Sequence, residues 1–385
     1  MNYRNKTNFN FPTSIRFGAG VIDELGAYLR QEGKKAPLVV TDPGLAKLPV
    51  FQRVLDILAK SDLQPTAFHD IAKNPVKSNV ASGVKAYNHA RSDSIVGIGG
   101  GASMDVARAI VLWVNHADHD LFDFDDTKGG DRFVVNDIPF FVTVPTTSGT
   151  GSEVGRSTVI ADDVTHEKKI LFSPKLLARK VFADPELTLG LPPFVTAATG
   201  MDALTHNLEA YIAQGFSPLC DGVAVEGLRL IFASLKQATQ QGDYDARAQM
   251  QVGSLMGATA FQKGLGIVHS LAHPLSTVYD MHHGLANAIM LPFGMEFNAK
   301  VSEERFQRVI DYCDLKITPA DFPRYLKDFS ASLGLPTTLK GQITPWTSEH
   351  HKKLSQLAFN DPCHPSNPRA VTEKDFYEIY EKAVG

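Results

Sequence analysis

Residues 96–114 read VGIGGGASMDVARAIVLWV, which predicts a buried strand, a glycine turn and a helix in direct succession. The turn holds Gly99, Gly100 and Gly101, and glycine lets backbone N–H groups approach a bulky anion closely. A helix that begins near Ala102 directs the positive end of its dipole at that anion. The stretch therefore predicts a pyrophosphate site, although an ordinary tight turn would also explain three glycines.

Two further segments, LVVTD at 38–42 and FFVTVPTT at 140–147, are almost continuously apolar and end in polar residues. Strands that are buried on both faces of a parallel sheet have this character. In the first half of the chain such runs alternate with helical stretches, which predicts an α/β domain with a mostly parallel sheet. Ligands of such domains bind at the carboxyl ends of the strands.

Polar groups at two of these strand ends suit a dinucleotide. Asp42 directly follows an apolar strand, where a carboxylate can accept from both ribose hydroxyls and repel a 2′-phosphate, or can cap the next helix. The segment PTTSGTGSE at 145–153 offers hydroxyls for phosphate or sugar oxygens, or forms a plain polar turn. Besides Asp42, the candidate cofactor contacts are Gly99, Gly100, Gly101, Ser103, Thr146, Thr147 and Thr150.

The sequence changes character near ADPELTLGLPP at 183–193. Beyond it, windows such as 194–213 and 221–238 repeat apolar residues every three or four positions, which predicts helices. We therefore expect a dinucleotide-binding α/β domain over 1–187 and an all-helical domain for metal and substrate over 188–385, packed across a cleft.

Composition excludes several classes of partner. With 38 basic and 42 acidic residues the net charge is -4, so no field of one sign attracts nucleic acid or an anionic membrane. No apolar run is long enough for a membrane helix, and residues 1–11 lack the apolar core of a signal peptide, so we expect a cytoplasmic protein. The three cysteines are too few and too far apart for a disulfide framework.

Two short segments of the second half gather metal-binding residue types. Asp202 and His206 are four residues apart, hence on one helical face, and residues 266–284 add four histidines: His269, His273, His282 and His283. A carboxylate with two or three imidazoles suits Fe²⁺, Zn²⁺ or Mn²⁺ and leaves a position open for substrate. Helical spacing pairs His269 with His273 and leaves His282 and His283 undecided.

At these residues the chain resembles the iron-containing (group III) alcohol dehydrogenases, from about residue 10 to the C-terminus. The joint occurrence of the matching segments, in order, is highly specific. They are GGGASMDVARA, PTTSGTGSEV, SPKLLARKVFADPELTLGLPP, TGMDALTHNLEAY, KGLGIVHSLAHPL, HHGLANAIMLP and NPR. The resemblance implies an N-terminal dinucleotide-binding domain, a helical C-terminal domain, one metal, preferably Fe²⁺, and a homodimer.

The resemblance also implies roles for particular residues. The metal ligands would be Asp202, His206, His269 and His283, with His273 as a histidine near the substrate that does not bind the metal. Lys168 joins the candidate cofactor contacts, and Cys363 would lie close to the nicotinamide. Three positions depart from the commonest pattern: Ala102-Ser103, Ser276-Thr277 and His282. These departures leave substrate specificity open more than the chemistry.

We therefore expect a dehydrogenase that exchanges a hydride between NAD(H) and a small alcohol or aldehyde, with His273 relaying the proton. One alternative keeps the fold but is a zinc-dependent enzyme like glycerol dehydrogenases or sugar-phosphate cyclases. A sugar-phosphate enzyme needs several cations, however, and Lys263 is the only one within 262–290. A non-catalytic assembly protein is the other alternative, and light scattering with an activity assay would distinguish it.

Overall fold

The computed structural model describes residues 13–385, so the predicted absence of a signal peptide over 1–11 lies outside the described residues. The described chain forms two compact units. The α/β unit contains 13–147 and 151–188, and the helical unit contains Ser148–Thr150 and Leu189–Gly385. Among residues 13–385, no helix is both long and apolar enough to cross a membrane.

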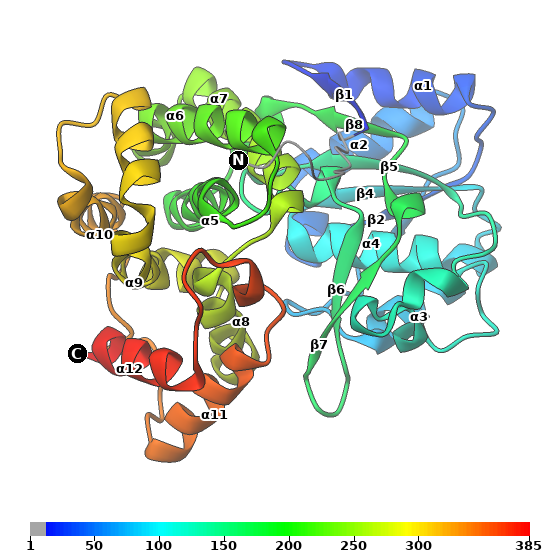
Figure 1. Cartoon of the computed structure of the whole chain (residues 1–385). Coiled ribbons are helices and arrows are strands. Elements are labelled where there is room, and N and C mark those ends of the chain that lie inside the picture. The colour runs from blue at the N-terminus through cyan, green and yellow to red at the C-terminus, as the bar shows by residue number, and fades with distance from the viewer. Residues whose placement is uncertain (1–12) are drawn as a thin grey trace. The chain divides into compact units, whose positions relative to one another are not determined.

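A six-stranded sheet in which every pairing is parallel forms the centre of the α/β unit (Figure 1). Its order is β1 (Ser14–Phe17), β8 (Lys180–Ala183), β5 (Phe140–Pro145), β4 (Ser94–Gly99), β2 (Pro37–Val40) and β3 (Thr66–Phe68). The three strands predicted from apolar runs are β2, β4 and β5, which lie next to one another. Strands β6 (Ser157–Ala161) and β7 (Lys168–Phe172) form a separate antiparallel hairpin.

Helices cover both faces of this sheet. Alternate residues of β4 face different cores: Ile95 packs with residues of α3 (Lys77–His89) and α4 (Gly101–Trp113), whereas Val96 packs with residues of α1 (Leu25–Gln31) and α2 (Pro49–Lys60). A strand that is buried on both faces has no polar side to mark its alternation, which is why these strands read as continuous apolar runs. The predicted parallel α/β fold is thus confirmed.

The helical unit is built around one buried helix. Residues 196–212 of α5 are all buried, and the helix packs against α6, α7 and α9. The helices of this unit are α5 (Pro193–Ile212), α6 (Pro218–Gln240), α7 (Tyr244–Ala260), α8 (Ile267–Tyr279), α9 (His283–Tyr312), α10 (Phe322–Ser332), α11 (Ser348–Phe359) and α12 (Glu373–Val384). Burial of Asp202, His206 and Glu209 within α5 would be costly unless each side chain has a partner, so these residues mark a site.

Candidate active site

Four side chains from three helices of the helical unit converge on one point. Asp202 and His206 lie one turn apart on α5, His269 lies in the first turn of α8, and His283 is the first residue of α9. One nitrogen or oxygen atom from each lies within 4.8 Å of the other three. The structure therefore brings together the ligand set that the family resemblance implies.

Burial and mutual charge set the protonation of this cluster. Asp202 Oδ1 lies 3.3 Å from His283 Nε2, and Asp202 Oδ2 lies 4.0 Å from His206 Nδ1. Burial by itself raises the pKa of Asp202, but the charges of His206, His283 and His269 outweigh it and lower that pKa to about 2. Burial lowers the pKa of His206 to about 4. A carboxylate and a neutral imidazole are the forms that bind a metal.

The residues present fit a divalent metal. His206 Nδ1 is buried and has no hydrogen-bond partner among residues 13–385, since Asp202 Oδ2 lies 4.0 Å away, and an unsatisfied buried nitrogen is costly. Three imidazoles and one carboxylate make a nitrogen and oxygen donor set suited to Fe²⁺ or Zn²⁺. The cluster can therefore hold the metal that the family implies.

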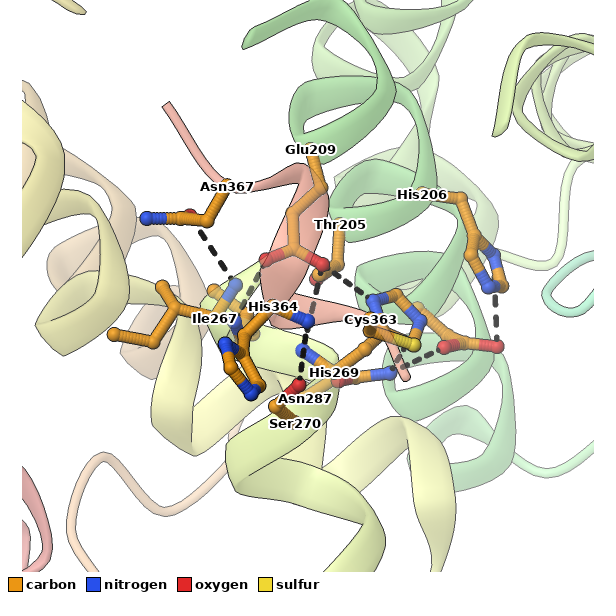
Figure 2. A network of polar contacts seen from close by, with 12 residues as sticks. Thr205, His206, Glu209, Ile267, His269, Ser270, Asn287, Cys363, His364 and Asn367 are labelled. Atoms are coloured by element: carbon orange, nitrogen blue, oxygen red, sulfur yellow. Dashed lines mark hydrogen bonds and ion pairs between the residues drawn. The ribbon is translucent and has the colours of Figure 1, made fainter. Parts of the chain in front are cut away.

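Two residues that sequence reasoning missed hold these ligands in place (Figure 2). Glu209 Oε2 accepts a hydrogen bond of 2.6 Å from His269 Nδ1. The amide nitrogen of Asn287 donates to Asp202 Oδ1 at 2.7 Å and lies 3.1 Å from His283 Nε2. The signal for Glu209 was present in the sequence, since an acidic residue three positions after His206 extends the polar face of Asp202 and His206 in a mostly apolar helix.

His273 is outside the four-residue cluster although it lies one turn after His269 on α8. Its Nδ1 bonds Asp361 Oδ2 at 2.7 Å, and its ring stacks on His283 with centroids 5.3 Å apart. The imidazole of His273 holds the pKa of Asp361 well below its usual range, against the effect of burial. With 26% of its side chain exposed, His273 is held by a carboxylate and reaches solvent.

The remaining candidates of this unit have other surroundings. His282, which spacing left undecided, is the N-cap of α9, and its Nδ1 accepts from the Leu285 N–H at 3.4 Å. Cys363 lies beside His273 and Asp361, and burial raises its pKa well above the usual value. Thr150 also belongs to the helical unit, whereas Thr146 and Thr147 of the same segment belong to the α/β unit.

In the α/β unit, the predicted cofactor residues gather where β2, β4 and β5 end. Gly99 ends β4 and accepts from the Thr146 N–H, which follows β5, at 3.0 Å. Gly99 has a φ of 140°, and an added Cβ would lie 2.5 Å from Ser103 Oγ, so only glycine fits. Gly100 is the N-cap of α4, and Thr147 lies against it. Such a turn before a helix N-terminus can receive a phosphate.

Asp42 caps the turn that follows β2, one of its two predicted roles, and it also lies beside the glycine turn. Its Oδ1 accepts from the N–H groups of Gly44 and Leu45, each at 2.9 Å, which caps the turn after β2. Its Oδ2 accepts from Ser103 Oγ at 3.3 Å. The two readings of Asp42 are therefore compatible, because capping uses only one of its oxygens.

Buried charges support the segment that follows β5. Arg108 of α4 is fully buried, and its Nη1 donates at 2.9 Å both to Ser152 Oγ and to the Ser157 carbonyl. Burial raises the pKa of the neighbouring Asp105 to about 6, although the charges of Arg108 and Lys168 act in the opposite direction. Because its charge acts on Asp105 of α4, Lys168, the first residue of β7, lies near that helix.

These features define a class of protein: a metal-dependent oxidoreductase with a dinucleotide-type α/β fold. Models of the family match residues 12–185 (iron-containing alcohol dehydrogenase) and 196–384 (Fe-containing alcohol dehydrogenase family, C-terminal). The chain belongs to the iron-containing alcohol dehydrogenase family, which confirms the predicted family and activity on CH–OH groups.

Named relatives match along almost their whole length. The chain is 37% identical to a 4-hydroxybutyrate dehydrogenase of Cupriavidus necator, over 97% of this chain and 98% of the relative. It is 32% identical to an NAD-dependent methanol dehydrogenase of Bacillus methanolicus, over 98% and 100%. The solved structure of an alcohol dehydrogenase from Oenococcus oeni matches with a TM-score of 0.92 at 30% identity, over 98% and 100%.

Proposed function

We propose that this chain is a homodimeric, NAD(H)-dependent alcohol dehydrogenase that oxidises small alcohols and reduces the corresponding aldehydes. One divalent metal, Fe²⁺ in preference to Zn²⁺, is held by Asp202, His206, His269 and His283. The observation that carries this proposal is the convergence of these four donors within 4.8 Å in a buried part of the helical unit. Asp42 and the glycine turn support NAD(H) as the cofactor.

A bound divalent metal supplies Lewis-acid polarisation of the substrate oxygen, and the nicotinamide carries the hydride. The protein residues supply position and proton transfer. Asn287 keeps Asp202 Oδ1 hydrogen-bonded and Glu209 holds His269, so both side chains are oriented before substrate arrives. Oxidation of an alcohol releases one proton besides the hydride. His273, held at Nδ1 by Asp361 and partly exposed, passes this proton to solvent.

The surroundings of Lys263 disfavour the sugar-phosphate alternative. Its side chain is fully buried, and its Nζ donates to the Tyr211 carbonyl at 2.9 Å and forms an ion pair with Asp221. The ammonium group of Lys263 is buried and bonded to these partners, so it is not available to bind a substrate phosphate. The only cation of 262–290 thus has a structural role, which supports a substrate without a phosphate group.

The substrate should be an alcohol with a short chain. Because one relative is named as a 4-hydroxybutyrate dehydrogenase, the first substrates to test are short ω-hydroxy acids and simple primary alcohols. Oxidation of NADH should be followed with propanal, butanal and succinic semialdehyde after anaerobic reconstitution with Fe²⁺ or Zn²⁺. We expect activity that returns with metal and is absent after chelation. Full activity in protein shown to be metal-free would overturn the proposal.

The position of Cys363 gives a separate prediction. If Cys363 faces the nicotinamide, bound NAD should slow its alkylation. Because burial raises its pKa, the thiolate is rare at neutral pH and labelling should be slow, so the comparison is best made near pH 9. Mass spectrometry of the Cys363 peptide measures the rate, with Cys313 in the same sample as the control. Equal rates for Cys363 with and without NAD would contradict its placement near the cofactor.

A further inference from the structure

We propose that Glu209 is a positioning residue that fixes the tautomer and orientation of His269, so that Nε2 is the nitrogen offered to the metal. The inference rests on the proposed metal-dependent function and extends it to a residue outside the ligand set. It follows from three contacts that one buried carboxylate makes with the first turn of α8.

Glu209 has no solvent-exposed surface, and its three hydrogen-bond donors among residues 13–385 all belong to α8. Its Oε1 accepts from the Val268 N–H at 2.6 Å, and its Oε2 accepts from the His269 N–H at 3.3 Å and from His269 Nδ1 at 2.6 Å. The first N–H groups of a helix have no partner within that helix, so the two backbone contacts of Glu209 cap α8. The same carboxylate also binds the ring of His269. One side chain of α5 therefore ties the helix of Asp202 and His206 to the third ligand.

The chemistry of a carboxylate decides the tautomer. An ionised carboxylate only accepts hydrogen bonds, so His269 Nδ1 must carry a proton, and a neutral ring then has its lone pair at Nε2. His269 Nε2 lies on the side of the ligand cluster, 3.3 Å from the amide nitrogen of Asn287 that also bonds Asp202. Carboxylates commonly hold metal-binding histidines in this way, and their loss typically costs about 10- to 100-fold in metal affinity.

The two roles of Glu209, capping of α8 and orientation of the His269 ring, can be tested separately. A second side chain, Asn367, also caps α8 but does not orient the ring (Figure 2). Asn367 Oδ1 accepts from the Ile267 N–H at 3.2 Å, and within residues 13–385 Asn367 makes no hydrogen bond to the ring of His269. At Gly266, an added Cβ would lie 2.8 Å from Glu209 Oε1 and 2.9 Å from Asn367 Oδ1. Both side chains therefore press closely on the start of α8, yet only Glu209 acts on the ligand.

The substitution Glu209→Gln tests the inference with almost no change of shape. With the amide nitrogen towards His269, the amide donates to Nδ1 and moves the ring proton to Nε2, the nitrogen that should bind the metal. With the amide turned round, its nitrogen opposes the Val268 N–H, and two donors face each other. In either arrangement we expect metal affinity to fall about 10- to 100-fold.

Metal affinity should be measured by Co²⁺ titration against a competing chelator, with the visible absorption of bound Co²⁺ as a report on the ligand set. Asn367→Ala is the matched control: it should lower thermal stability and leave Co²⁺ affinity and spectrum unchanged. His269→Ala is the positive control and should lose the metal.

Wild-type affinity in Glu209→Gln, with loss of metal in His269→Ala, would overturn the inference and leave the proposed function standing. Retention of metal by His269→Ala would instead refute the proposed ligand set. If Glu209→Gln does not fold, ¹⁵N spectra of histidine in the zinc-loaded wild-type protein decide. His269 should be protonated at Nδ1 and bound to zinc through Nε2, and coordination through Nδ1 would refute the inference.

Discussion

His283→Ala should purify with little bound metal, whereas His273→Ala should keep close to one metal ion per chain. His283 Nε2 lies 3.3 Å from Asp202 Oδ1 within the ligand cluster, and its loss leaves three donors around a buried site. His273 makes its Nδ1 contact with Asp361 instead, so its loss should leave the cluster complete. Elemental analysis of both proteins, prepared side by side, measures the difference directly.

Turnover should fall in both variants but for different reasons. Removal of a general acid or base typically costs about 100- to 10,000-fold, so His273→Ala should be slow although loaded with metal. Added Fe²⁺ should rescue His283→Ala in part and should leave His273→Ala unchanged. A metal-free His273→Ala beside a metal-replete His283→Ala would reverse the assignment, and the helical pairing of His269 with His273 would then hold.

Replacement of Asp42 should relax the preference for NAD(H) over NADP(H). A carboxylate facing the adenosine ribose repels the 2′-phosphate, at a cost of about 1.4 to 2.7 kcal/mol, or about 10- to 100-fold in kcat/KM. Wild-type enzyme should therefore discriminate by this factor, and Asp42→Gly should lose most of it. Values of kcat/KM for both cofactors, at one ionic strength, measure the change.

The second role of Asp42 calls for a matched variant. Since Asp42 Oδ1 also caps the turn at Gly44 and Leu45, Asp42→Gly removes a cap along with the charge. Asp42→Asn keeps an acceptor for the turn and removes only the charge. Both variants should accept NADP(H) better, and only Asp42→Gly should be less stable. Equal kcat/KM for the two cofactors in the wild-type enzyme would refute the prediction.

Much of the fold could be predicted from the sequence because burial on both faces is visible in it. Strands β2, β4 and β5 are almost continuously apolar where helices cover both sides, and polar residues or glycine, such as Asp42, Gly99 and Thr146, stand where the chain leaves the sheet. The buried helix α5 was equally clear from its periodicity. Local pattern and final environment agree at these elements, so little tertiary information was needed.

The arrangement of the metal cluster depended on tertiary packing that spacing does not contain. His269 and His273 occupy the same face of α8, and helical geometry treats them alike. The structure separates them through their partners, since Glu209 of α5 lies beside the first and Asp361 beside the second. Only the family resemblance favoured His283. Glu209 was overlooked because its partner lies 60 residues further along the chain.

The four donors lie on three helices, and a long stretch of chain separates α5, which carries two of them, from α8 and α9. An unfolded chain holds no such cluster, so metal binding is thermodynamically linked to folding of the helical unit. Each tenfold rise of free metal above its dissociation constant adds about 1.4 kcal/mol to the free energy of unfolding. If these donors bind the metal as proposed, chelation should lower the stability of the folded enzyme as well as its activity.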